Sequence, residues 1–323
     1  MLRTRSRSDY GFTVHRAIAF KKALAVIFTL LFLCAILAAS INLRGREQND
    51  IEALGRMYTS GDYEKAYALS GEELKKEPLD FFLLTIHGFS AFELAVAQIN
   101  SFDTLVYIND CIWSLRKTFL SRQSAEDGRI FYILGKAYYY KGPEYADLAV
   151  KYLEKAGSLS YPARDIPEYL GLAYIAVKDY RGSVAAFSAA LHPGAEGSAA
   201  GGGEVFEPSD LFLISIARSY LALEETERAK AYLIRCVESS RDSKTVVAAR
   251  LLLGEIYSKA GDQAAAEVQY LAVIAEIDEN AEAHFQLGEI YNTGGDMARA
   301  RAEWRKAVRL DPSHKPARAR LNM

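Results

Sequence analysis

The sequence contains few cysteines and few prolines, 3 and 8 among 323 residues. Three cysteines do not make a disulfide framework. Cys34 lies in an apolar run, whereas Cys111 and Cys236 fall within helical patterns, so we expect the last two to be buried thiols, with a functional thiol as the alternative. The remaining composition, 50% hydrophobic and 25% charged with 20 tyrosines, is that of an ordinary globular protein.

The sequence also lacks the motifs of known active sites. It has no G-x-S-x-G elbow, no phosphate-binding loop and no dinucleotide fingerprint. The five histidines are scattered, and no pair has the spacing of metal ligands on a helix face. We therefore predict no catalytic residue, no metal site, no cofactor and no enzymatic activity, and an enzyme with unrecognised active residues is the alternative. His87 falls on an apolar helix, where we expect a hydrogen-bonded core histidine.

Basic residues are concentrated at the two ends of the chain. The first 50 residues carry eight Lys and Arg against three acidic residues, which leaves 31 basic and 38 acidic residues after position 50. No basic stripe runs through that remainder, so we predict no nucleic-acid partner. From Arg299 onward the chain is basic again. This segment predicts either a solvated cap on the fold or a docking surface for an acidic partner or lipid headgroups.

Residues 23–43, ALAVIFTLLFLCAILAASINL, contain no charged side chain. As a helix this run would be about 30 Å long, the thickness of the hydrocarbon core of a bilayer. Six Lys or Arg and one acidic residue precede it, so the positive-inside rule places residues 1–22 in the cytoplasm and the rest of the chain in the periplasm or an equivalent extracytoplasmic space. We expect an uncleaved, single-pass signal anchor. A signal peptide cleaved near Ala38–Ser40 is the alternative.

A short phrase recurs along the chain. GDYEKAYAL starts at residue 61, KDYRGSVAAF at 178, GDQAAAEVQY at 261 and GDMARARAEW at 295. The last two copies are 34 residues apart, and the same spacing separates Gly254 from Gly288, Tyr257 from Tyr291, Ala266 from Ala300, and Tyr270 from Trp304. A fixed period of this kind predicts a repeat architecture.

This pattern resembles the tetratricopeptide repeat (TPR), a helix–turn–helix unit of 34 residues. Small residues let the two antiparallel helices approach closely, and a large residue fills the space beside them. By this resemblance the first-helix small residues are Gly88, Gly135, Gly171, Ala217, Gly254 and Gly288, and the large residues are Phe187, Leu233, Tyr270 and Trp304. In the repeated phrase, glycine ends one helix with a positive φ and aspartate caps the next.

The resemblance implies an all-α fold: a TPR-type helical-hairpin solenoid of about seven units in a right-handed superhelix, preceded by one transmembrane helix. The predicted segments are a cytoplasmic stretch (1–22), the anchor (23–43), an N-terminal TPR half (47–191), a glycine-rich loop (192–209), a C-terminal TPR half (210–314) and a basic tail (315–323). Within the first half, residues 81–127 form an extended, degenerate unit with a long apolar first helix and a second helix near 103–120. The glycine-rich loop is a flexible connection or, alternatively, a hinge or a segment that orders on a partner.

The first helices of a TPR array line a concave wall, so the resemblance also implies a partner groove. In the N-terminal half its residues would be Tyr58, Phe82, Phe89, Phe92, Tyr132, Lys136, Tyr139 and Tyr140, followed by Leu172 and Ile175. In the C-terminal half they would be Arg218, Glu255, Lys259, Glu282, Glu289 and Asn292. Exposed aromatic side chains favour a binding surface, whereas the alternative is that these rings pack as core. The Lys/Asn set that binds chaperone C-termini is missing.

These features predict a membrane-anchored TPR scaffold that binds protein or peptide partners and helps to assemble an envelope complex. By analogy of architecture, it would serve a flagellar motor, a pilus or a secretion machine. The alternative is a periplasmic carrier that encloses a small molecule or lipid in the aromatic groove. Neither the partner nor the oligomeric state follows from the sequence.

Overall fold

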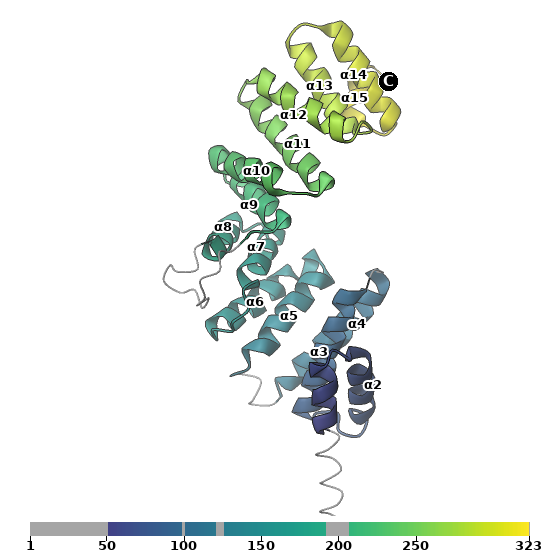
Figure 1. Ribbon diagram of the computed structural model, residues 1–323, viewed down its shortest axis with the longest axis vertical. Coiled ribbons are helices and arrows are strands. Elements are labelled where there is room, and N and C mark those ends of the chain that lie inside the picture. Colours follow the sequence, from purple (N-terminus) through teal and green to yellow (C-terminus); the bar gives the residue numbers. More distant parts are fainter. Residues whose placement is uncertain (1–50, 99–100, 121–125, 192–206, 323) are drawn as a thin grey trace, which may run out of the picture. The chain divides into compact units, whose positions relative to one another are not determined.

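The computed structural model describes residues 51–98, 101–120, 126–191 and 207–322. Within these ranges every regular element is a helix, and no β-strand occurs (Figure 1). The predicted cytoplasmic stretch 1–22, the anchor 23–43 and most of the glycine-rich loop lie outside them. Among the helices that are described, none has the length and apolar character needed to cross a bilayer.

The chain forms two compact units, one ending at Ala97 and the other beginning at Gln98. Unit 1 contains a helix over 51–59, α2 (Tyr63–Glu73) and α3 (Phe81–Ala97). The boundary falls inside the predicted repeat 81–127, between its long apolar first helix and its second helix. That second helix, expected near 103–120, is α4 (Ser101–Thr118) and is the first element of unit 2.

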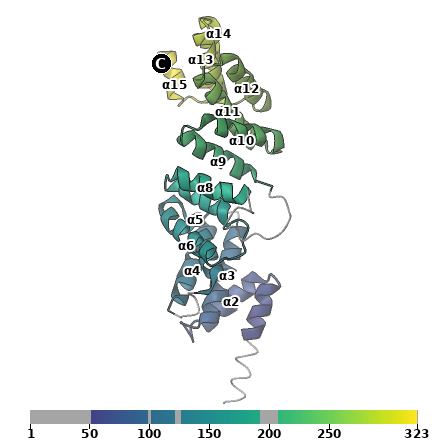
Figure 2. The same ribbon diagram turned by 90° about the vertical axis from the view of Figure 1, so that its left-hand side faces the viewer.

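Unit 2 continues as consecutive helical hairpins (Figure 2). In chain order its further elements are α5 (Gly128–Lys141), the short 3-10 helix η2 (Pro143–Tyr145), α6 (Ala146–Ser158), α7 (Ile166–Ala176), α8 (Tyr180–Leu191), α9 (Asp210–Ala222), α10 (Thr226–Ser239), α11 (Ser243–Lys259), α12 (Gln263–Glu276), α13 (Ala281–Thr293), α14 (Met297–Leu310) and α15 (Lys315–Arg320). The odd-numbered helices from α5 to α13 pair with the helix that follows them, and the second helix of each hairpin packs on the first helix of the next. Sequential stacking of this kind is the arrangement that the repeat period predicts.

The repeated phrase forms the turn of the hairpins in which it occurs, as its residue types predict. Gly261 and Gly295 have φ values of 82° and 81°, in the left-handed region that favours glycine. The next residue, Asp262 or Asp296, caps the second helix by accepting a hydrogen bond from the backbone N–H three residues on, at 3.0 Å in both cases. Lys178 adopts a similar φ of 62° in the looser copy of the phrase, so the turn does not require glycine.

The predicted contacts between small and large residues are also present. A Cβ atom added to Gly254 would lie 2.6 Å from the Tyr270 ring, and one added to Gly171 would lie 2.6 Å from the Phe187 ring. A methyl group does not fit at such distances without displacing the ring. In α7 and α11 the glycine of the first helix therefore allows the aromatic ring of the second helix to lie directly on the backbone.

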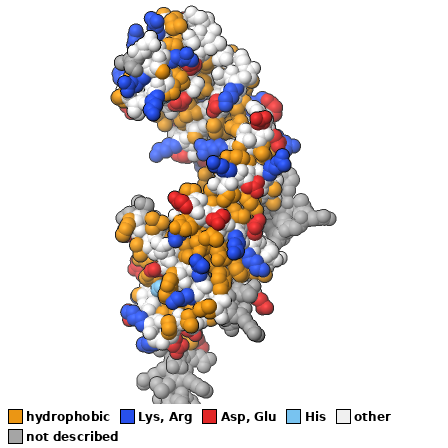
Figure 3. All heavy atoms as spheres, turned by 180° about the vertical axis from the view of Figure 1, so that it is seen from behind, with side chains coloured by type: hydrophobic (Ala, Val, Ile, Leu, Met, Phe, Trp, Pro, Cys, Tyr) orange, Lys and Arg blue, Asp and Glu red, His pale blue; other side chains and the backbone are white. Residues whose placement is uncertain are grey.

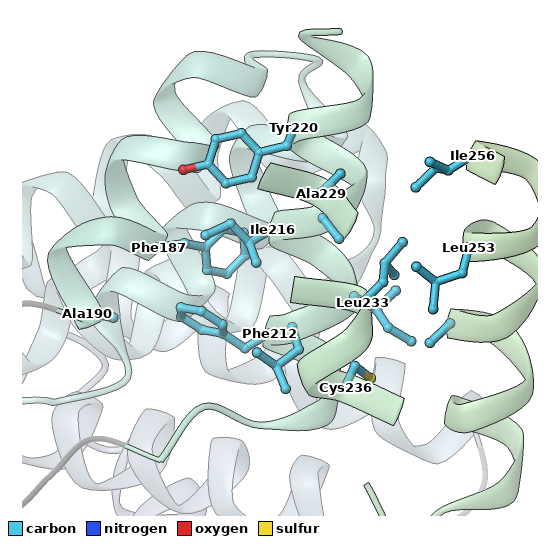
Figure 4. Close-up of a cluster of buried hydrophobic side chains, with 14 residues drawn as sticks. Phe187, Ala190, Phe212, Ile216, Tyr220, Ala229, Leu233, Cys236, Leu253 and Ile256 are labelled. Atoms are coloured by element: carbon cyan, nitrogen blue, oxygen red, sulfur yellow. The ribbon is translucent and has the colours of Figure 1, made fainter. Parts of the chain in front are cut away.

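The largest core cluster extends from α7 to α11 (Figure 4). Phe187 on α8 and Phe212 on α9 meet edge to face, with ring centroids 4.6 Å apart. Leu233 on α10 and Leu253 on α11 continue the same cluster. Since α8 and α9 share this core, the apolar interior is continuous across the glycine-rich segment that separates them in sequence.

The two described cysteines and His87 are buried, as the sequence predicts. Cys111 and Cys236 are free and fully buried, and burial raises the pKa of the Cys236 thiol to about 11. His87 in unit 1 lies between Ser70 Oγ, at 3.0 Å from its Nδ1 atom, and the Tyr67 ring, which stacks on it with centroids 4.4 Å apart. His87 is therefore a hydrogen-bonded core histidine.

Candidate aromatic binding face

The residues predicted for the groove in unit 1 are mostly inside the protein. Tyr58, Phe89 and Phe92 are at most 9% exposed, and the Tyr58 and Phe89 rings contact each other with centroids 6.2 Å apart. Phe82 is half-buried and packs on Leu54 and its neighbours. The cause is the composition of α3, which is apolar on nearly every side, so the groove expected at these four positions is replaced by core packing and offers little surface to a partner.

The four predicted residues in unit 2 lie together on α5. Tyr132, Lys136, Tyr139 and Tyr140 follow one another at helical spacing, and the side chains of Asp165 and Tyr169, at the start of α7, meet them. We call these six residues the aromatic face. It joins the first helices of two consecutive hairpins, which is the placement that the TPR resemblance implies.

The centre of the aromatic face is a polar cluster. The Tyr132 hydroxyl donates to both Asp165 carboxylate oxygens at 2.8 Å, and Lys136 Nζ donates to Asp165 Oδ2 at 2.9 Å and to the Tyr132 hydroxyl at 3.0 Å. Burial alone would lower the pKa of Lys136, but the hydrogen bonds from its ammonium group to Tyr132 and Asp165 outweigh this effect and raise the pKa above its ordinary value. The lysine thus stays charged and fixed, and its charge is balanced within the protein.

Tyrosine rings surround this polar cluster. Lys136 Nζ lies 4.4 Å from the centroid of Tyr169, within the range of a cation–π contact. Tyr139 meets Tyr169 edge to face at 5.3 Å and Tyr140 at 5.5 Å, and the Tyr140 and Tyr169 hydroxyls are 2.9 Å apart. Burial raises the pKa values of Tyr132, Tyr139 and Tyr169, so their hydroxyls remain protonated at neutral pH. The rings of Tyr139, Tyr140 and Tyr169 contact one another directly and form one continuous aromatic cluster.

Several other residues predicted for the wall already have partners. Leu172 and Ile175 on α7 pack against the α8–α11 core. In the C-terminal half Glu255 pairs with Lys259 at 2.6 Å, whereas Glu282 and Glu289 on α13 pair across to α15 through His314 and Arg320. Arg218 is exposed and Asn292 is half-buried. The start of the predicted basic tail is a short helix that packs on α14 and reaches α13 through Arg320.

Sequence reasoning missed Asp165 and Tyr169. Tyr169 belongs to α7, and Asp165 is the N-cap residue of this helix, directly before Ile166–Pro167, where a helix start is expected. The available signal was the repeat register, which places Asp165 one turn before Tyr169 and beside the corresponding residues of α5. In the part of the chain that is described, no group of three or more His, Cys, Asp or Glu side chains is placed to hold a metal ion.

Comparison with known proteins supports the repeat assignment. Residues 281–314 and residues 214–280 match two tetratricopeptide repeat family models, so TPR repeats are present over 214–314. No functionally curated protein matches the chain.

Solved structures extend the likeness in fold to the earlier hairpins. The C-terminal part of a TPR repeat-containing protein from Cytophaga hutchinsonii aligns with a TM-score of 0.61 and 15% identity, over 84% of this chain and all (100%) of that one. YrrB, described as a TPR protein with an unusual peptide-binding site, aligns with a TM-score of 0.50 and 20% identity, over 65% of this chain and 98% of its own. At these identities the likeness defines the fold, an all-helical TPR-like solenoid, and nothing finer.

Proposed function

We propose that this protein is a membrane-tethered scaffold that binds a protein or peptide partner through the aromatic face of α5 and α7. TPR repeat proteins are in general protein-interaction modules, and this general class is supported by the repeats over 214–314. The observation that supports the particular site is the continuous tyrosine surface around Lys136, which is built on two rigid helices. Tyrosine supplies large contact area at a low cost in side-chain entropy, and for that reason it is enriched among the residues that dominate binding energy.

The chemistry of the face favours a neutral, partly apolar peptide segment. Lys136 and Asp165 neutralise each other, so the face offers no free charge for a carboxylate or an ammonium group. The Tyr140 ring is 39% exposed and offers an apolar side together with a hydroxyl that can hydrogen-bond to peptide carbonyls. YrrB, which shares the fold, is itself described as having a peptide-binding site, and this adds an analogy but no residue-level support.

The tether and the compartment are further parts of the proposal. They rest on the uncharged run 23–43 and on the basic residues that precede it, which favour an anchor with the repeats in an extracytoplasmic space. Tethering raises the effective concentration of the binding face near other envelope components. An accessory role in a motor, pilus or secretion assembly would use this arrangement.

Site-specific photocrosslinking in cells tests the binding face. A photoreactive phenylalanine analogue at position 140 should capture a partner, whereas the same analogue at Val268, an exposed residue of α12, should not. Tyr139→Ala should reduce the capture at position 140 while the circular dichroism spectrum stays unchanged. Equal labelling at both positions, or none at position 140, would contradict the proposal.

The photocrosslinked sample also distinguishes a scaffold from a carrier of small molecules or lipids. A carrier would yield a co-purifying apolar ligand in mass spectrometry and no crosslinked protein. The contact of Tyr139 with Tyr140 and Tyr169, at centroid distances of 5.5 Å and 5.3 Å, favours a scaffold surface over an enclosing pocket.

A further inference from the structure

The last long helix of unit 2, α14, carries a line of arginines on its exposed side. Arg301, Arg305 and Arg309 are exposed and follow one another at intervals of four residues. They therefore lie about 6 Å apart along the helix axis and span about 80° around it. Arg305 is about 160° around the axis from Ala307, which lies on the buried side of the helix. We call these three arginines the arginine row, and in Figure 3 Lys and Arg side chains gather at the end of unit 2 that α14 and α15 form.

The basic charge of α14 and α15 is only partly neutralised within the protein. Residues 297–320 include eight Lys and Arg against two acidic residues. Three of the eight, Arg299, Lys306 and Arg320, form ion pairs with carboxylates. Among the residues that the structure describes, the other five have exposed side chains without an ion-pair partner, and they are Arg301, Arg305, Arg309, Lys315 and Arg318.

The like charges of the arginine row weaken the helix that carries them, because basic side chains four residues apart on a helix repel each other. The second helix of an earlier hairpin, α10, is arranged differently. At its start Arg228 pairs with Glu225 at 2.9 Å, and Lys230 pairs with Glu227 at 2.6 Å. The acidic residue of α14, Glu303, is buried and already accepts hydrogen bonds from other basic groups. A negatively charged ligand would remove the repulsion along the row, so the row is suited to an anionic occupant.

The other side chains of α14 favour an acidic protein segment over a lipid or a nucleic acid. Ala298 and Ala302 are exposed beside the arginine row, and Met297 is the one large apolar side chain that this helix exposes. The helix thus lacks the apolar face with which interfacial helices enter a bilayer. Its aromatic residue, Trp304, is 3% exposed, so the helix offers no ring on which a base could stack.

We propose that the arginine row binds an acidic segment of a partner protein. Guanidinium groups bind carboxylates through paired, charge-assisted hydrogen bonds. An extended chain places every second side chain on the same side at a spacing of about 6.6 Å, which is close to the spacing of about 6 Å between successive arginines. A segment with Asp or Glu at alternate positions therefore matches the row in charge and in spacing. Because α14 is the second helix of its hairpin, whereas the aromatic face is built on first helices, this site is separate from the aromatic face and does not depend on it.

Fluorescence anisotropy with the full-length protein tests the charge and the position of the site. The probes are a labelled peptide of alternating Glu and Ser and a matched peptide of alternating Gln and Ser. The wild type should bind the Glu peptide and not the Gln peptide, and added salt should weaken the binding because exposed charges are screened. Replacing Arg301, Arg305 and Arg309 together by Gln should raise the dissociation constant about tenfold, since three exposed ion pairs are lost. Binding of the Glu peptide that this triple variant retains in full would overturn the proposal.

A second triple variant controls for net charge. Arg235, Arg241 and Lys244 are exposed residues elsewhere in unit 2, and replacing them by Gln removes the same charge without touching the arginine row. This variant should bind the Glu peptide as the wild type does, and so should Tyr139→Ala, which alters only the aromatic face. Equal weakening in the two triple variants would show that net charge alone controls binding and would overturn the proposal. Circular dichroism confirms that each variant folds.

Photocrosslinking in cells identifies the natural occupant. A photoreactive phenylalanine analogue at position 302, an exposed alanine beside the arginine row, should capture a protein segment rich in Asp and Glu. Mass spectrometry of the crosslinked peptide maps that segment, and the capture should fall when the three arginines of the row are replaced by Gln. Capture of lipid, of a second copy of this chain or of a segment poor in acidic residues would assign the row to another occupant and overturn the proposal, as would the absence of any capture at this position.

Discussion

The indole ring of Trp304 occupies the space that a side chain at position 288 would need: a Cβ atom on Gly288 would lie 2.6 Å from Trp304 Cδ1. The close approach of α13 and α14 therefore depends on the absence of a single methyl group. Gly288→Ala should lower the free energy of unfolding by about 1–3 kcal/mol, the cost of overpacking a core. Urea denaturation, monitored by circular dichroism, measures this change in unfolding free energy.

Gly157 provides the control for this substitution. It lies in α6, and a Cβ atom there would meet nothing within 4 Å. Gly157→Ala should stabilise the protein by up to about 1 kcal/mol, because alanine is the better helix former. Equal effects of the two substitutions would show that helix propensity rather than packing controls position 288.

Two copies of the repeated phrase differ in their cap. Asp262 accepts a hydrogen bond from the backbone N–H of Ala265 at 3.0 Å, whereas Asp62 makes no such cap bond and pairs with the exposed Lys65. Asp262→Ala should cost about 1 kcal/mol of stability, and Asp62→Ala should cost less than about half of that. Thermal unfolding of the two variants makes the comparison. A larger loss of stability for Asp62→Ala than for Asp262→Ala would contradict this prediction.

Stability at acidic pH should depend on Glu303. Burial alone would raise the pKa of this carboxyl, but hydrogen bonds from Lys306 at 2.8 Å and from His284 at 2.6 Å outweigh that effect and hold the pKa below its ordinary value of 4.5. Because the folded-state pKa is the lower one, the contribution is complete above pH 4.5 and is lost as the pH falls through the folded-state pKa.

Glu303→Gln isolates this contribution. The variant should be less stable than the wild type at neutral pH, and the difference in unfolding free energy should shrink as the pH falls below 4.5. Denaturant titrations at a series of pH values provide the measurement. A difference that stays constant over that range would exclude Glu303 as the titrating group.

Substitutions at Phe89 and Tyr140 should separate core from surface. Phe89 is 4% exposed, so Phe89→Ala should lower the unfolding free energy by about 3–5 kcal/mol. Tyr140 is 39% exposed, and Tyr140→Ala should cost no more than about 1 kcal/mol, the value of one hydrogen bond. A large loss of stability from Tyr140→Ala would mean that the aromatic face is structural.

The repeat was predictable because its signals are local and recur. Gly254 and Gly288, with Tyr270 and Trp304 opposite them, specify a hairpin within one 34-residue period, and the structure confirms both contacts. The turn glycine is a weaker signal, since Lys178 adopts the same left-handed backbone. Periodicity therefore located the hairpins even where the residue types had diverged.

The candidate site was only partly predictable. The register placed Tyr132, Lys136, Tyr139 and Tyr140 on one helix, and in the structure all four lie on α5. It could not distinguish them from Phe89 and its neighbours, because the pattern specifies which side of a helix faces the wall but not whether another element covers that side. Including Asp165 and Tyr169 in the site would have required knowing the contacts between two successive hairpins. These contacts depend on packing and not on the spacing of residues in the sequence.

The contact of α15 with α13 has a consequence for selectivity. Two glutamates of α13 are paired with residues near the end of the described chain: Glu289 with Arg320, and Glu282 with His314. A cationic ligand would therefore compete with Arg320 for the Glu289 carboxylate. The Glu289 carboxylate is thus neutralised within the chain, which lowers the attraction of this surface for positively charged ligands.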